Sequence, residues 1–321
     1  MAQLAEEYQR TLVTGGTGLV GSAIKDVLID RLVNLANWRF LSSKDGDLSD
    51  PQAVDKIFSD FKPTRVIHLA AMVGGLFHNM ANNLDFFRTN IAINDNVLRA
   101  SYETGVKKVV SCLSTCIFPD VVQYPITETM IHQGEPHSSN FGYSYAKRMI
   151  DVQNRAIFEK YGFKYTSVIP CNVYGPNDNY HLQKSHVIPG LIHKFFLAKQ
   201  KNEEAVVMGS GAPLRQFIFS KDLAKLFLWV LDNYDEVSPI ILSVDEEHEV
   251  SIKTVAELIA KTLGIEQELV FDIDAADGQY KKTASNAKLR SLLPGFQFTP
   301  IEDGIKESVE WFMKNYDTAR K

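Results

Sequence analysis

The sequence predicts an α/β protein: a doubly wound, Rossmann-type parallel sheet with a second, smaller and more helical lobe. Two observations lead to this class. A glycine cluster, GGTGLVG, lies between a short β-branched run and an amphipathic stretch. Strand-like and helix-like segments then alternate with short connections, which is typical of a parallel sheet covered by helices on both faces. The 321 residues are sufficient for such a unit and its second lobe.

Each expected element follows from its hydrophobic pattern. Short runs of β-formers between turn residues predict strands at 10–14, 37–43, 64–71, 107–114 and 164–175. Apolar residues with a period near 3.6 predict helices at 22–32, 51–61, 85–104 and 143–160. Beyond residue 172 the alternation loosens, with helices expected at 186–200, 221–234 and 255–264 and short strands at 205–209 and 216–220. We therefore place the domain boundary at residue 172, and expect later segments to return to the first sheet.

Composition excludes several classes of function. The net charge is −5 and no basic run occurs, which argues against a nucleic-acid or membrane surface as the main partner. The three cysteines form no close pair of the CxxC type, so neither a disulfide framework nor a metal site is expected. The first ten residues hold no apolar core of signal-peptide length. We expect a soluble, cytoplasmic protein with reduced thiols.

The glycine cluster predicts a dinucleotide site. Gly15, Gly18 and Gly21 have the spacing GxxGxxG between an expected strand and an expected helix. Such glycines allow a tight turn, close approach of the pyrophosphate and packing of helix on strand, while the helix N-terminus offers free N–H donors. We expect the backbone of Thr17, Leu19 and Val20 to contribute to this site.

The end of the second expected strand predicts NADP rather than NAD. An NAD site normally offers an acidic residue here, but the sequence reads Leu41-Ser42-Ser43-Lys44. Hydroxyls and an ammonium at Ser43 and Lys44 suit a 2′-phosphate. Asp45 is close enough to this strand end to leave NAD as the alternative cofactor, and Lys44 could also be an ordinary solvated lysine. Residues 47–48, Asp47 and Leu48, are candidates to flank the adenine.

Tyr143 and Lys147 predict an acid–base pair. A spacing of four at the start of a helix places both on one face. A neighbouring ammonium favours the phenolate, so we expect Lys147 to lower the pKa of Tyr143 and also to hold the nicotinamide ribose. Ser114, at the end of an expected strand, would supply a hydroxyl to a substrate carbonyl. Tyr145 has no lysine four residues later and is set aside.

Together these motifs resemble the extended short-chain dehydrogenases/reductases, and in particular the GDP-L-fucose synthase family. The resemblance rests on HLAA with Ala70 and Ala71, and on six further segments in order: AAMVGG (70–75), LSTCIFP (113–119), NFGYSYAKRM (140–149), GPNDN (175–179), SHVIPGLIHK (185–194) and GSGAPLRQF (209–217). It implies an NADPH-dependent enzyme that inverts C3 and C5 of GDP-4-keto-6-deoxy-D-mannose and reduces C4. It also implies an NADP-binding domain over 1–172, a mainly GDP-sugar-binding lobe over 173–321, and a homodimer.

The resemblance assigns proton transfer to Cys116 and His186. Both inverted carbons lie beside the C4 ketone, so removing a proton there gives an enolate whose oxygen Ser114 and Tyr143 can stabilise. A thiol and an imidazole have reference pKa values on either side of neutrality, which suits one donor and one acceptor. Taken alone, Cys116 would be a buried hydrophobe and His186 a capping or surface histidine. Cys112 and Cys171 are interpreted as core residues.

The resemblance also implies residues that bind the substrate. The diphosphate calls for cations, for which Lys194, Arg215 and Lys282 are candidates. Lys194 stands where some relatives have arginine, and Met208 where some have tryptophan, which leaves the wall of the base site open. Asn172 and Asn179 complete the expected set.

Rival functions share parts of this pattern. A sugar-nucleotide 4,6-dehydratase would need carboxylic acids beside the serine, where this chain has Thr115 and Cys116. A 4-epimerase that retains NAD would be expected to have the missing acid after the second strand. A non-catalytic NADP sensor would not need the set formed by Ser114, Tyr143 and Lys147.

Overall fold

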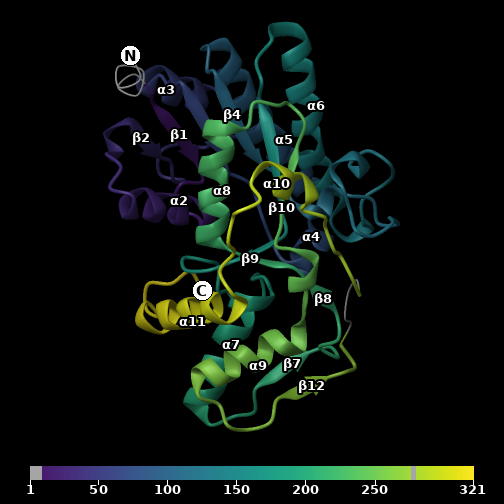
Figure 1. The fold of residues 1–321 in the computed structure, drawn as a ribbon. Helices are drawn as coiled ribbons and strands as arrows, with labels where there is room; N and C mark the ends of the chain where they lie inside the picture. The colour runs from purple at the N-terminus through teal and green to yellow at the C-terminus, as the bar shows by residue number, and fades with distance from the viewer. Residues whose placement is uncertain (1–8, 276–279) are drawn as a thin grey trace.

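The computed structural model describes residues 9–275 and 280–321, and its centre is a six-stranded, fully parallel sheet. The strand order is β10-β5-β4-β3-β1-β2 (Figure 1). The direction in which the chain adds strands reverses between β1 and β3. Ligands of open α/β sheets bind beside such a switch point, at the carboxyl ends of the strands. The strands are β1 (Thr11–Thr14), β2 (Trp38–Phe40), β3 (Arg65–His68), β4 (Lys108–Cys112), β5 (Thr166–Pro170) and β10 (Ile240–Leu242).

Helices cover both faces of this sheet (Figure 1). One face packs against α3 (Pro51–Phe61), α5 (Asn83–Glu103) and α6 (Phe141–Tyr161). The other packs against α2 (Leu19–Asp30), α8 (Ser220–Asn233) and α10 (Ala287–Leu292). Because the inner strands are apolar on both sides, burying them requires two layers of helices. A short helix, α4 (Leu76–Ala81), precedes α5.

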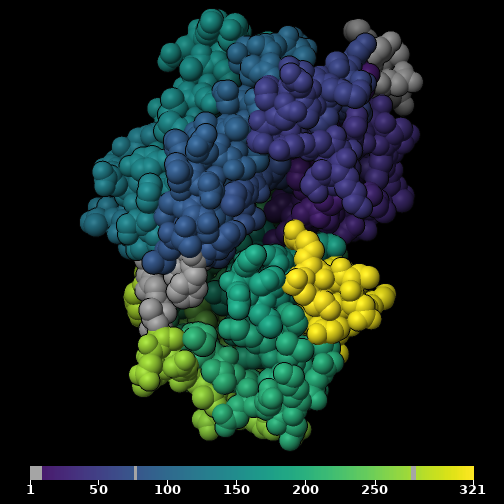
Figure 2. Space-filling model, turned by 180° about the vertical axis from the view of Figure 1, so that it is seen from behind, coloured from purple at the N-terminus to yellow at the C-terminus, as the bar shows by residue number. Residues whose placement is uncertain are grey.

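A third hydrophobic cluster forms the core of the second lobe. It lies between α7 (Val187–Lys201), α9 (Ile252–Leu263) and α11 (Ile301–Lys314). Within the described residues, three two-stranded sheets complete the lobe and its junction: β6 (Asn172–Tyr174) with β9 (Phe217–Phe219), β7 (Val206–Met208) with β12 (Val270–Asp272), and β8 (Leu214–Arg215) with β11 (Val250–Ser251). From behind, the yellow C-terminal residues lie on this lobe, below the purple N-terminal residues (Figure 2).

The predicted fold class is confirmed, with two corrections to the strands. The expected strand over 164–175 is two strands, because the chain leaves the main sheet at Cys171 and β6 pairs with β9 instead. The expected strand over 37–43 ends at Phe40, since Ser42 turns back to bond with Asp45. Among the described residues, no helix is both long and apolar enough to cross a membrane.

Candidate active site

The glycine turn after β1 is shaped to admit a ligand. A Cβ at Gly16 would lie 2.6 Å from the Cβ of Phe40, and one at Gly21 would lie 2.5 Å from the carbonyl oxygen of Gly15. Gly15 has φ +65°, which L side chains rarely adopt. Gly18 occupies the N-cap position of α2, so no side chain caps the helix there, and the first turn contains no acidic residue. The N–H groups and positive dipole end of α2 therefore remain for a phosphate, and the expected NADP pyrophosphate fits this cradle.

A buried hydrogen-bond chain fixes the neighbouring loop after β3. Thr14 Oγ1 accepts from the backbone N–H of Ala70 at 3.1 Å and contacts His68 Nδ1 at 2.8 Å. The other ring nitrogen, Nε2, lies 3.0 Å from Asn94 Oδ1, while Asn94 Nδ2 donates to the carbonyl oxygen of Ala146 on α6. Burial lowers the pKa of His68 to about 3, so the ring is neutral. The chain connects the expected cofactor loop to the helix that carries Tyr143 and Lys147.

The turn after β2 is exposed and partly organised by an acid. Ser43 and Lys44 are exposed, as a site for a 2′-phosphate requires. Asp45, which kept NAD open, accepts from the backbone N–H and hydroxyl of Ser42 and lies 3.7 Å from Arg39. The Ser42 N–H lowers the pKa of this carboxyl, with a smaller contribution from Arg39. Asp45 is thus engaged within the turn, and Arg39 adds a cation that the sequence reasoning did not weigh.

The residues expected beside the adenine have defined partners. Asp47 accepts from both the N–H and the hydroxyl of Ser49, at 2.9 and 2.8 Å. The carbonyl oxygen of Leu48 accepts from Asn96 Nδ2 at 3.1 Å, and its side chain packs on the core. The structure therefore anchors this loop to α5.

Ser114 and Cys116 lie in one tight turn that follows β4. Ser114 is the N-cap of the 3-10 turn η2 (Thr115–Ile117), and its Oγ accepts from the N–H of Cys116 at 3.4 Å. Cys116 is 9% exposed and packs against the core. Three cations interact electrostatically with Cys116: Lys147, Arg148 and Lys282. Cys116 therefore combines the burial expected of a structural cysteine with the electropositive surroundings typical of a reactive one.

Tyr143 and Lys147 lie together on α6, but the expected pKa effect is wrong. The Lys147 ammonium lies 5.9 Å from the centre of the Tyr143 ring and donates to the carbonyl oxygen of Cys112 at 2.9 Å. Burial raises the pKa of Tyr143 well above its usual value, and the nearby thiols of Cys116 and Cys112 raise it further. Burial also lowers the pKa of Lys147. Desolvation thus sets the direction of the pKa shift, and the phenol stays protonated.

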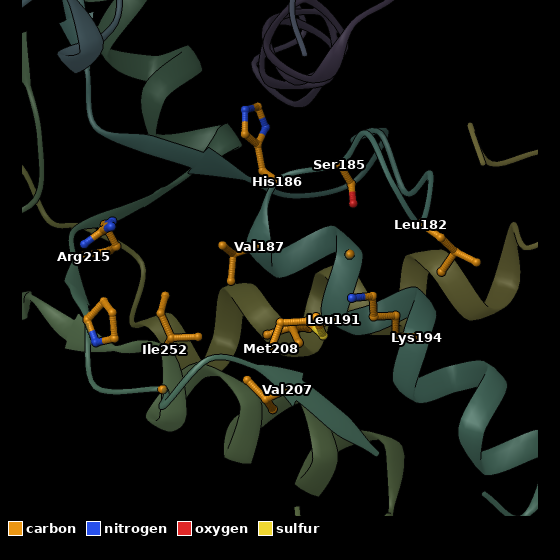
Figure 3. A pocket seen from close by; sticks show the side chains of 13 residues that line it. Leu182, Ser185, His186, Val187, Leu191, Lys194, Val207, Met208, Arg215 and Ile252 are labelled. Carbon is orange, nitrogen blue, oxygen red and sulfur yellow. The ribbon is translucent and has the colours of Figure 1, made fainter. Parts of the chain in front are cut away.

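A pocket of about 260 Å³ lies in the second lobe (Figure 3). Four expected residues line it: His186, Lys194, Met208 and Arg215. Figure 3 shows the His186 ring at the start of α7, on the side away from Met208, with Lys194 further along the same helix. His186 occupies the N-cap position of α7 but makes no side-chain cap bond, so its imidazole is not used for capping.

The remaining expected residues are placed differently. Lys282 does not line the pocket, but interacts electrostatically with both Cys116 and Arg215, and burial lowers its pKa. Asn172 is exposed and donates from Nδ2 to the carbonyl oxygen of Gln216 at 3.0 Å. Asn179 Oδ1 accepts from the N–H of His181, so the Asn179 side chain shapes the loop before α7.

Three polar residues at the site were missed by the sequence reasoning. Gln216 is buried, exchanges two hydrogen bonds with the backbone of Ala284 at 2.8 and 3.1 Å, and ties the segment after Lys282 to β9. Asp178 is 4% exposed, and burial raises its pKa to about 6 while His186 lowers it. The third is Arg148. Each lies inside a quoted motif, so the available signal was a polar residue adjoining an assigned one.

The matching family model is that of the NAD dependent epimerase/dehydratase family, over residues 11–244. With the Rossmann-like sheet, the glycine cradle and the pair on α6, this defines the class: the chain belongs to that family.

Its relatives narrow the class. The chain is 59% identical to a GDP-L-fucose synthase of Dictyostelium discoideum, covering 97% of each chain. It is 58% identical to a probable GDP-L-fucose synthase of Drosophila melanogaster, covering 98% of this chain and all of that one. A crystal structure of a GDP-L-fucose synthetase from Naegleria fowleri bound to NADP superimposes with a TM-score of 0.94 at 50% identity, covering 98% of this chain and 95% of that one.

Proposed function

We propose that the protein is a GDP-L-fucose synthase, which epimerises GDP-4-keto-6-deoxy-D-mannose at C3 and C5 and reduces it at C4 with NADPH. The observation that carries this function is the placement of a thiol, Cys116, within the same turn as Ser114, beside Tyr143 and Lys147 on α6. A simple reductase needs the last three residues and has no use for the thiol. The full-length similarity to GDP-L-fucose synthases supports the same function.

The cofactor site is formed by the glycine cradle, the N-terminus of α2 and the loop at Ala70 and Ala71. When bound, NADPH supplies the hydride for reduction at C4. Ser43 and Lys44 hold the 2′-phosphate, and Lys147 holds the nicotinamide ribose. The NADP complex of the similar Naegleria fowleri protein supports NADP as the cofactor.

Epimerisation uses two groups on opposite faces of the sugar. Cys116 and His186 exchange protons at C3 and C5, one removing a proton and the other replacing it from the other face. Ser114 and Tyr143 donate hydrogen bonds to O4, where charge collects in the enolate. Because burial keeps Tyr143 protonated, it is a donor at this stage and the proton source for O4 during reduction.

The GDP part of the substrate binds in the pocket of the second lobe. Lys194 and Arg215 line it and supply positive charge for the diphosphate, while Met208 provides an apolar wall for the base. Lys282 interacts electrostatically with Cys116 and with Arg215 of this pocket, and it contacts the sugar-linked phosphate. Asn172, at the start of β6, and Asn179, in the loop before α7, act beside the sugar.

The two lobes divide the work between them. Residues 1–172 form the NADP-binding domain, and residues 173–321 form mainly the GDP-sugar lobe; the place of β10 in the main sheet supports the expected return of the chain. The protein works as a cytoplasmic homodimer that pairs through α5 and α6. Large apolar side chains exposed on these helices support the pairing: Phe87, Val152, Phe158 and Tyr161.

One experiment tests the function directly. The purified protein is incubated with NADPH and GDP-4-keto-6-deoxy-D-mannose, and the product sugar is identified by NMR. We expect GDP-L-fucose. A product with the original configuration at C3 and C5 would indicate a plain 4-reductase, and binding of NADPH without turnover would indicate a sensor.

A further inference from the structure

Arg148, which directly follows Lys147, is a buried cation held by backbone carbonyls. It is 4% exposed. Its Nε donates to the carbonyl oxygen of Ile117 at 3.0 Å, and Nη2 donates to the same oxygen. Its Nη1 donates to the carbonyl oxygen of Gly134 at 2.9 Å. Among the ion pairs of the described residues, none includes Arg148.

Burying this guanidinium costs free energy, which indicates that Arg148 has a specific role. Removing a guanidinium from water carries a desolvation penalty, and no ion pair with a carboxylate of the described residues offsets that penalty for Arg148. Burial accordingly lowers the pKa of Arg148. An apolar side chain would fill the same space without that penalty. The reason for a buried arginine at this position must therefore be sought in the groups that accept its hydrogen bonds.

Its donors hold the turn that carries Cys116. Ile117 is the last residue of the 3-10 turn, and carbonyls at a helical C-terminus lack partners within the helix. Arg148 satisfies this one with two donors, while Ser114 caps the other end of the turn. Cys116, one residue before Ile117, is thus fixed from both sides.

Two successive side chains of α6 frame the reacting segment. Lys147 holds the carbonyl oxygen of Cys112, and Arg148 holds that of Ile117, five residues later. Between these two anchors lie Ser114 and Cys116. The same helix carries Tyr143, so the frame sets the distance between the phenol and the thiol.

A second contact supports the guanidinium. The carbon at its centre lies 5.2 Å from the centre of the Tyr145 ring, three residues earlier on α6. This is within the range of a cation–π interaction. Tyr145, which the sequence reasoning set aside, therefore has a place in the same arrangement.

We propose that Arg148 is a positioning residue for Cys116, holding the end of its turn at a fixed place relative to Tyr143 and Lys147. The inference rests on the proposed function for its catalytic consequence, but not for its structural one. Arg148 itself does not touch the reacting atoms. Its loss should affect proton transfer at C3 and C5 more than hydride transfer at C4.

The test compares Arg148→Lys with Arg155→Lys, the same substitution two turns later on α6, where Arg155 is 55% exposed. In Arg148→Lys the charge remains but the guanidinium fork is lost. We expect the incorporation of solvent deuterium at C3 and C5 to fall about tenfold, with uninverted product appearing and the Kd for NADPH unchanged. Arg155→Lys should match the wild type. Equal loss of deuterium incorporation and of reduction would overturn the proposal.

A double-mutant cycle separates positioning from mere stability. If Arg148 acts through Cys116, the Cys116→Ser/Arg148→Lys protein should incorporate deuterium no more slowly than Cys116→Ser alone. Defects that multiply would contradict the proposal, because Arg148 would then act independently of the thiol.

A structural readout makes the inference testable whether or not the proposed function holds. In Arg148→Lys, amide hydrogen exchange followed by mass spectrometry should become at least several-fold faster in the peptide that spans 113–118, with exchange in α6 unchanged. Unchanged exchange would overturn the proposal. Should Arg148→Lys fail to fold, Tyr145→Leu, which removes only the supporting ring, is expected to give a smaller change in the same peptide, and the absence of that change would count equally against it. A wild-type protein that makes no GDP-L-fucose would instead refute the proposed function.

Discussion

The ammonium of Lys147 is bound to the carbonyl oxygen of Cys112, 2.9 Å away, rather than to the phenol of Tyr143. One cation on α6 thereby fixes the end of β4, from which the turn with Ser114 and Cys116 begins. The phenol of Tyr143, whose ring centre lies 5.9 Å from the same ammonium, stays protonated because desolvation and two nearby thiols raise its pKa. The site is thus arranged to hold a phenol ready to give up its proton.

Replacing that proton source should stop reduction with little effect on binding. Tyr143→Phe keeps the ring, so we expect hydride transfer to slow by about 10²–10⁴-fold while the Kd for NADPH is nearly unchanged. Single-turnover NADPH oxidation and fluorescence titration measure the two quantities. Tyr145→Phe, the same change two residues later, is the control and should behave as the wild type. Reduction at a near-normal rate in Tyr143→Phe would exclude Tyr143 as the acid.

Replacing the thiol should separate epimerisation from reduction. Cys116→Ser preserves size, but a hydroxyl is a far weaker acid than a thiol, so proton transfer at C3 and C5 should suffer strongly. We expect continued NADPH oxidation, uninverted GDP-6-deoxy sugars by NMR and less solvent deuterium in the product. His186→Asn should give the complementary loss on the other face. Cys171→Ser, at a buried thiol outside this turn, is the control. Normal GDP-L-fucose from Cys116→Ser would leave Cys116 a core residue.

Removing the cation after β2 should reduce the preference for NADPH over NADH. A charge-assisted contact to the 2′-phosphate is worth about 1.5–3 kcal/mol, so Lys44→Ala should weaken NADPH binding at least tenfold and leave NADH binding unchanged. Lys56→Ala, which removes an exposed lysine of α3, should change neither Kd. Equal affinity of the wild type for both cofactors would contradict the assignment of Ser43 and Lys44.

The neutral, buried His68 should make stability fall on acidification. Its pKa is about 3 in the folded protein and near 6.5 when unfolded, so between these values the unfolded chain binds the extra proton. The contribution of neutral His68 to the free energy of unfolding is complete above pH 6.5 and is lost progressively as the pH falls towards 3. The loss amounts to about 2 kcal/mol at pH 5. Urea unfolding at pH 7.5 and 5 measures it.

The matched comparison for this prediction uses an exposed histidine. His68→Gln should flatten the dependence of unfolding free energy on pH, since glutamine keeps a donor and an acceptor without a titrating proton. His248→Gln, at a side chain 59% exposed, should keep the dependence of the wild type. Identical slopes in His68→Gln and the wild type would show that other groups cause the acid sensitivity.

Local patterns sufficed for much of the fold and not for the details of the site. The glycine cluster and the spacing of Tyr143 and Lys147 depend on adjacent turns of chain, and the structure has the expected strand, turn and helices around them. The break at Cys171 depends on pairing between β6 and β9, which are about forty residues apart, so hydrophobicity alone predicted one continuous strand.

The predicted direction of the pKa shift of Tyr143 was wrong for a related reason. Spacing along a helix indicates which residues are neighbours, but not how deeply they are buried or where a flexible ammonium finds its acceptor. The carbonyl of Cys112 comes from a different element and competes for Lys147. The contacts of Arg148 with Ile117 likewise join separate segments, which no periodicity in the sequence encodes.

The return of β10 to the main sheet has a mechanical consequence. After β9 the chain goes back to the sheet through α8 and β10, and α10 packs beside β10 before α11 rejoins the second lobe (Figure 1). Several segments of the chain therefore connect the two lobes, and the lobes cannot rotate about a single connecting segment. A protease that cuts one of these segments leaves the lobes joined by the others. Neither lobe is a contiguous stretch of sequence, so neither could be transferred to another enzyme as a single segment.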